Sequence, residues 1–153
     1  MTAPRKAALL VLSALAVSAC AVATEPCAPG GGGGSAASLV GSWRYFGVQQ
    51  APVHSTLSGT LSVTQQSCAN FSGQLDLLEV NAQGGTRRLA GPISGKMIEA
   101  SSLRFDAFVE AVPWQHLGML AGAGDSLSGT WLALDGTGQS VSGTFGGRRE
   151  NRR

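Results

Sequence analysis

The sequence predicts an all-β fold, a small antiparallel up-and-down β-barrel of about eight strands. From Leu39 onward, apolar residues recur with a period of two rather than 3.6, which is typical of half-buried antiparallel strands. Turn residues interrupt this pattern at short intervals. An apolar-Ser-Gly-x-apolar motif occurs five times, as LSGTL, FSGQL, ISGKM, LSGTW and VSGTF. Repeated glycines inside strands favour the sharp bends that close a small barrel.

The N-terminal segment predicts export. Arg5 and Lys6 precede an apolar run from Ala7 to Val17, and the segment closes on small residues, as in a secretory signal peptide. The run is too short for a transmembrane helix, which needs about 20 apolar residues. We therefore assign residues 1–19 to a signal peptide.

The four residues Val17-Ser18-Ala19-Cys20 end this segment and resemble the lipobox of bacterial lipoproteins. The resemblance implies that Cys20 is acylated, with palmitate-type chains, and becomes the mature N-terminus. Ala21 replaces the aspartate that retains lipoproteins at the inner membrane, so the implied location is the outer membrane, facing the periplasm. The alternative is a soluble secreted or periplasmic protein, because Ala21-Val22-Ala23 is an A-x-A cleavage site that would remove Cys20.

Residues 20–38 follow as the lipidated cysteine and a disordered tether of Gly, Ala, Pro and Ser, which cannot bury a core. The barrel domain is expected over residues 39–149, and residues 150–153 form a basic tail. Cys27 in the tether and Cys68 in the domain form an even pair in an oxidising compartment, which favours a disulfide. The alternative is two unpaired thiols.

The charge balance excludes a broad nucleic-acid surface. The sequence has eleven basic and nine acidic residues. Loss of Arg5 and Lys6 with the signal peptide leaves nine of each, so the mature chain is formally neutral. The expected partners are the membrane, through the lipid anchor, and either a small apolar ligand or another envelope protein, but no nucleic acid.

We expect strands near 40–48, 56–65, 70–80, 86–94, 96–100, 102–111, 114–121, 126–134 and 139–147. Turns are expected at NAQGG, residues 81–85, and at DG, residues 135–136. In each motif copy the glycine shares a face with its apolar neighbours, which predicts five barrel-closing glycines that face inward: Gly59, Gly73, Gly95, Gly129 and Gly143. The missing side chains are either replaced by neighbouring Leu, Phe and Trp or leave a hollow interior.

Gly41-Ser42-Trp43, at the head of the first strand, resembles the G-x-W motif of lipocalin- and avidin-like barrels, the calycins. In that family an arginine near the end of the last strand packs over the tryptophan. Arg148 and Arg149, directly after VSGTFGG, stand in the corresponding place. The resemblance implies the barrel architecture and identifies no ligand.

The sequence displays no enzyme signature, so we expect a non-enzymatic protein with no catalytic residue, no metal and no cofactor. His54 and His116 are the only histidines and have no His or Cys at ligand spacing. The candidates for a ligand-binding site are large apolar residues with a polar group: Trp43, Trp114, Trp131 and His116. Two functions remain open: a barrel that binds a small apolar ligand, and a structural or inhibitory module that binds a protein partner through its surface or loops.

Overall fold

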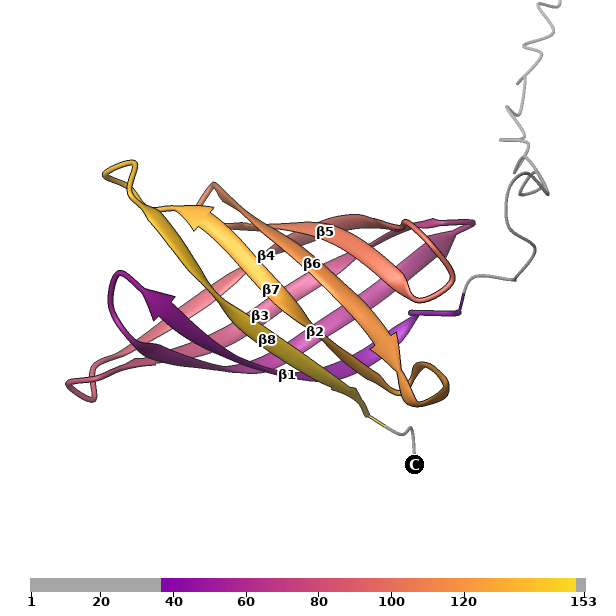
Figure 1. Ribbon diagram of the computed structural model, residues 1–153, viewed down its shortest axis with the longest axis horizontal. Coiled ribbons are helices and arrows are strands. Elements are labelled where there is room, and N and C mark those ends of the chain that lie inside the picture. The colour runs from indigo at the N-terminus through magenta and orange to yellow at the C-terminus, as the bar shows by residue number, and fades with distance from the viewer. Residues whose placement is uncertain (1–36, 151–153) are drawn as a thin grey trace, which may run out of the picture.

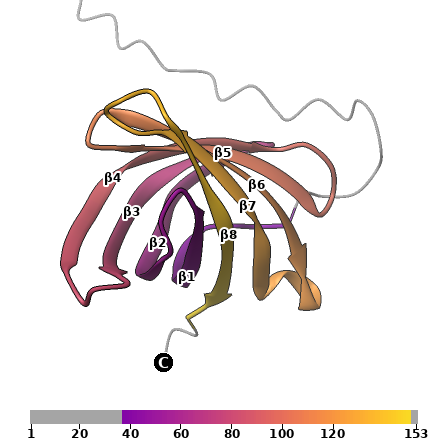
Figure 2. The same cartoon turned by 60° about the vertical axis from the view of Figure 1, so that its left-hand side comes forward.

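The computed structural model describes residues 37–150, which form a closed, eight-stranded antiparallel β-barrel (Figure 1). Each strand pairs with the next along the chain, and the last pairs with the first, so that the sheet wraps around one interior (Figure 2). The predicted fold class is therefore confirmed. The strands are β1 (Gly41–Ala51), β2 (Ser55–Ser67), β3 (Asn70–Asn81), β4 (Thr86–Met97), β5 (Ser102–Val109), β6 (Val112–Ala121), β7 (Ser126–Leu134) and β8 (Ser140–Arg149).

One expected strand does not exist as a separate element. The sequence pattern divided residues 86–100 into two strands, 86–94 and 96–100, but β4 runs without a break to Met97, and residues 98–101 form the turn to β5. The separation was wrong because Gly95 is a bend within a continuous strand. It pairs with Phe71 of β3 on one side and with Phe105 of β5 on the other.

Helical structure in the described part of the chain is limited to a short 3₁₀ turn, η1 (Gly122–Gly124), between β6 and β7. Across residues 37–150, none of the helical structure is long and apolar enough to cross a membrane.

The barrel interior is filled by apolar and aromatic side chains on alternate positions of every strand. The largest side chains that are almost completely buried include Trp43, Trp131, Tyr45 and Phe105. Their rings contact one another and neighbouring aromatics: Phe105 packs on Phe71 and Phe145, with ring centroids 6.2 and 5.9 Å apart. Such packing gives the barrel a core at the density of an ordinary globular protein.

The five motif glycines lie at inward positions, but they are places of close approach rather than empty space. A Cβ on Gly129 would overlap the carbonyl oxygen of Leu117 and lie 2.7 Å from the Cα of Gly118 on the adjacent strand. At Gly143 a Cβ would lie 2.7 Å from the indole nitrogen of Trp131. The space that glycine vacates is therefore occupied by the neighbouring strand or by an aromatic ring, and the bends let the sheet coil into a narrow barrel.

One end of the barrel is sealed, and we call it the closed end. The chain enters there, and β8 ends there (right-hand side of Figure 1). The indole Nε1 of Trp43 donates to the carbonyl of Leu39 at 2.9 Å, and the guanidinium carbon of Arg149 lies 4.3 Å from the centroid of the Trp43 ring. Arg149 also donates to the carbonyls of Val40, at 2.9 Å, and Ser38. Of the two arginines expected to cover Trp43, Arg149 is the one that does so.

The opposite end, which we call the open end, carries four connections: residues 52–54, 82–85, 110–111 and 135–139. No chain segment comparable to Leu39 crosses this end within residues 37–150. The inward-facing positions near the open end therefore define the candidate site.

Candidate ligand-binding site

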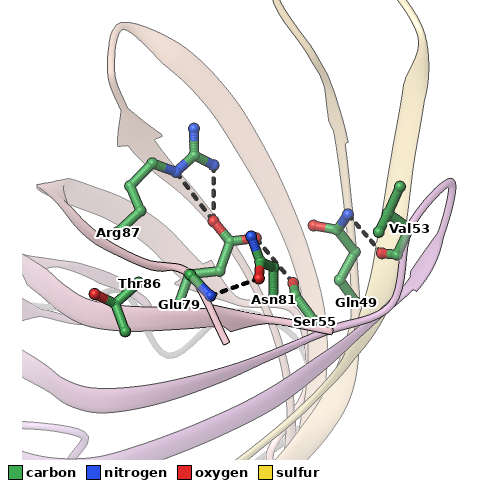
Figure 3. Close-up of a pocket in the computed structure, with 8 residues that line it drawn as sticks. Gln49, Val53, Ser55, Glu79, Asn81, Thr86 and Arg87 are labelled. Atoms are coloured by element: carbon green, nitrogen blue, oxygen red, sulfur yellow. Dashed lines mark hydrogen bonds and ion pairs between the residues drawn. The ribbon is translucent and has the colours of Figure 1, made fainter. Parts of the chain in front are cut away.

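The inward positions of three adjacent strands change from apolar to polar at the open end. Ser55 on β2, Glu79 on β3 and Arg87 on β4 follow the same alternation that places leucines in the core. Ser55 Oγ donates to Glu79 Oε1 at 2.8 Å, and Arg87 Nε donates to Glu79 Oε2 at 3.0 Å (Figure 3). Arg87 also lies 3.5 Å from Glu110 of the β5–β6 connection. These three inward side chains, Ser55, Glu79 and Arg87, form what we call the polar rim.

A hollow of about 350 Å³ lies against the polar rim. Gln49, Val53 and Asn81 also line it (Figure 3). Gln49 Nε2 donates to the Val53 carbonyl at 2.9 Å, and the Asn81 side-chain oxygen accepts from the backbone N–H of Gly85 at 2.8 Å. The hollow is of the size at which small-molecule sites begin, and its walls are held by their own hydrogen bonds.

The opposite wall of the barrel is aromatic at this end. Trp114 on β6 and Trp131 on β7 stack with ring centroids 4.6 Å apart and an interplanar angle of 12°. Each lies one inward position below the end of its strand, marked by Val112 and Ala133. Trp131 Nε1 is buried and finds no hydrogen-bond acceptor within residues 37–150. A buried donor without an acceptor is costly, so this indole N–H is a candidate contact for a ligand.

His116 lies deeper in the barrel, next to Trp131 in the β6–β7 register, and is completely buried. Its Nδ1 is 2.9 Å from the carbonyl oxygen of Trp114, which can only accept, so Nδ1 carries the proton. Nε2 is then free to accept from the Tyr45 hydroxyl at 3.3 Å. The His116 ring stacks on Phe105 with centroids 4.2 Å apart.

Burial controls the ionisation of this pair. It lowers the pKa of His116 to about 4, although the hydrogen bond to the Trp114 carbonyl acts in the opposite direction. Burial likewise raises the pKa of the Tyr45 hydroxyl far above its ordinary value. Both side chains are therefore neutral at physiological pH, which suits a histidine that serves the core through hydrogen bonds.

The structure divides the expected site residues between the two ends. Trp114, Trp131 and His116 lie together on β6 and β7, whereas Trp43 belongs to the closed end. The polar rim was missed at the sequence level. The signal was present in LDLLEVN, where Glu79 shares its face with Leu75 and Leu77. A charged residue on the apolar face of a strand is informative about function.

The cysteines give a partial answer. Cys68 lies in the β2–β3 turn at the closed end and is disulfide-bonded. Cys20 and Cys27 lie outside the described residues. Within the described part of the chain, no group of three or more His, Cys, Asp or Glu side chains could hold a metal ion.

The fold and the site define a class: a small antiparallel β-barrel sealed at one end, with an aromatic interior and a polar rim at the other. The contact between Arg149 and Trp43 agrees with the calycin resemblance. No protein-family model matches the sequence. No curated protein matches it either.

Solved structures match the fold. EF1p2_mFAP2b, bound to DFHBI, has a TM-score of 0.60 and 13% identity over 73% of this chain and 94% of its own. A de novo designed fluorescence-activating β-barrel has a TM-score of 0.54 and 18% identity over 77% of this chain and 100% of its own. The redesigned barrel mFAP1, bound to DFHBI, has a TM-score of 0.54 and 16% identity over 76% and 100%. At these identities the similarity shows the fold alone.

Proposed function

We propose that this chain is a non-enzymatic binding protein of the bacterial envelope, held by a lipid on Cys20, whose barrel takes a small molecule at its open end. The lipobox resemblance supports the location. The hollow beside the polar rim and the stacked Trp114–Trp131 pair support the site. Two of the structurally similar barrels, EF1p2_mFAP2b and mFAP1, are bound to DFHBI, so a barrel of this shape is compatible with a small ligand.

The observation that carries the proposal is the buried indole N–H of Trp131 without an acceptor. An unsatisfied buried donor costs about 1–3 kcal/mol, and a ligand that supplies an acceptor recovers that cost. Because the centre of the barrel is filled, the ligand is not a purely apolar molecule in a deep cavity. It is a small molecule with an aromatic or apolar part toward Trp114 and Trp131 and polar groups toward the rim.

The test combines recovery of a native ligand with binding of known probes. Native mass spectrometry of the protein after gentle detergent extraction should show a copurified small molecule. Small aromatic carboxylates, added to the stripped protein, should quench tryptophan fluorescence and raise the melting temperature.

Two matched variants locate the site. Trp131→Phe keeps the stacked ring but removes the N–H, and should weaken carboxylate binding about fivefold or more, since a hydrogen bond to a charged group contributes about 1.5–3 kcal/mol. Trp43→Phe, at the closed end, should leave the affinity unchanged. Equal affinities in the two variants, or no copurified molecule and no bound carboxylate, would contradict the proposal.

A second candidate, a module that binds a protein partner, is favoured by one observation on the outer surface. A hollow of about 380 Å³ crosses β5 to β8 and is flanked by Leu117 and Leu132, which are 55% and 47% exposed. Exposed apolar groups at a hollow are typical of interaction sites. Pull-down from envelope extract with wild type and with Leu117→Ser/Leu132→Ser separates the two functions, because only a surface partner is lost from this variant.

A further inference from the structure

We infer that the closed end of the barrel docks on an anionic lipid surface. The inference starts from two pairs of like charges that the strand register places directly opposite each other. Arg44 of β1 pairs with Arg148 of β8, and Lys96 of β4 pairs with Arg104 of β5. All four side chains face outward and are exposed. Like charges opposite each other on one face of a sheet repel and destabilise the pairing.

None of these four cations is neutralised within the described residues. The ion pairs across residues 37–150 use other arginines: Arg87, Arg88 and Arg149. The repulsion within each pair is therefore not offset by an acid in this part of the chain. An anion outside the chain would offset it.

The four cations share one location. Each lies within three positions of the strand end that borders the closed end: Gly41 of β1, Met97 of β4, Ser102 of β5 and Arg149 of β8. Exposed apolar side chains occupy the same end: Val40, Ile98 and Met119 are 38%, 54% and 59% exposed. Cations mixed with exposed apolar groups fit the interface of a membrane, where charged heads meet the edge of the hydrocarbon region.

The acids of this end do not cancel the cations. Asp125 lies 3.8 Å from Arg149, and Glu150 accepts a hydrogen bond from Ser42 at 2.6 Å. Glu99, in the β4–β5 turn, is the one acid there whose side chain has no hydrogen-bond or ion-pair partner among residues 37–150. At the open end, by contrast, Arg87 is paired with Glu79. Uncompensated positive charge is thus confined to the closed end.

The spacing of the pairs favours a surface over a single ion. The β1/β8 pair and the β4/β5 pair lie on opposite sides of the closed barrel. One phosphate could meet one pair, but only an extended array of anionic headgroups meets both. The chain also leaves the barrel toward its N-terminus at this end, through Ala37 and Val40 (Figure 1). A lipid on Cys20 would therefore hold this end toward the bilayer, although the charge argument does not depend on the anchor.

The test is co-sedimentation of the full chain carrying Cys20→Ser, so that no acyl chain contributes. Vesicles of phosphatidylglycerol and phosphatidylethanolamine should bind the protein, and binding should weaken as salt rises. Phosphatidylcholine vesicles should bind it at least tenfold less. Comparable binding to both kinds of vesicle would overturn the inference.

Single substitutions of equal charge locate the surface. Arg104→Gln should lower vesicle affinity several-fold, whereas Arg88→Gln, on the outer face of β4 and paired with Asp76, should change it less than twofold. A variant with all four cations replaced by glutamine should lose most of the binding and its salt dependence. Circular dichroism checks that each variant is folded, and the single variants decide the matter if the fourfold one is not.

Three results would refute the lipid surface. Equal loss in Arg104→Gln and Arg88→Gln would show that only net charge matters. Full displacement by inorganic phosphate at constant ionic strength would show a single-ion site. Binding of duplex DNA as tightly as of the anionic vesicles would show a general polyanion surface.

Discussion

The buried His116 predicts a specific loss of stability in acid. In the native barrel burial lowers its pKa to about 4, whereas the ordinary value is 6.5. Between these two values the unfolded chain binds a proton that the native chain does not. The free energy of unfolding should therefore be complete above pH 6.5 and fall as the pH falls toward 4.

The size of the loss follows from the shift. Each pKa unit corresponds to about 1.4 kcal/mol, so the interval from 6.5 to about 4 corresponds to about 3 kcal/mol. The carboxylates of Asp76 and Asp135 have pKa values lowered by hydrogen bonds, from Arg88 and Thr137 respectively. Their contributions are lost only as the pH falls below about 4, so they leave this window to His116.

Urea unfolding at fixed ionic strength, at half-unit steps from pH 4 to 7.5, measures the effect. His116→Gln should flatten the dependence in this window, whatever its effect on absolute stability. His54→Gln removes the other histidine, which is exposed in the β1–β2 connection, and should keep the wild-type slope. If wild type shows no loss between pH 6.5 and 4, or if His116→Gln shows the same loss, the argument from burial is wrong.

Three further predictions concern the bends, the closed end and the anchor. Gly129→Ala should lower the free energy of unfolding by about 1–3 kcal/mol because its Cβ would overlap the Leu117 carbonyl, whereas Gly136→Ala, with open space around it, should change little; equal melting temperatures would contradict this. Arg149→Met should cost about 1–3 kcal/mol in urea unfolding, because it leaves the Val40 carbonyl without its donor, and a cost near zero would show that the cap is dispensable. Radiolabelled palmitate should enter the wild-type protein but not Cys20→Ser, which should leave the membrane fraction; label in both, or in neither, excludes Cys20 as the lipidation site.

The fold was predictable because its signals are local. The alternation of apolar residues and the recurrent Ser-Gly motif each act within a few residues, and together they define strands and bends. The contact between Trp43 and Arg149 was also within reach, since it joins the two ends of the domain. Gly95 was the exception, because a glycine in a strand is compatible with a break or with a bend, and only its partners on both sides distinguish them.

The candidate site was harder to predict because it depends on register. Which polar residues meet at the rim depends on how each strand is offset from the next, and irregularities such as the shift between Val63 and Gln65 in the β2–β3 pair alter that offset. The same is true of the Arg44–Arg148 pair, whose members are far apart in the sequence. The unpaired indole of Trp131 needed side-chain packing, which no sequence pattern reports.

The seam between β1 and β8 has a kinetic consequence. Arg149 donates to a carbonyl 109 residues earlier in the sequence, so the barrel cannot close until the last strand is present. Until then β1 has a free edge, and any chain that emerges N-terminus first must pass through an unclosed sheet able to pair with another chain. Topologies dominated by such distant contacts fold slowly. Truncation within β8 should therefore leave an aggregation-prone product rather than a slightly smaller barrel.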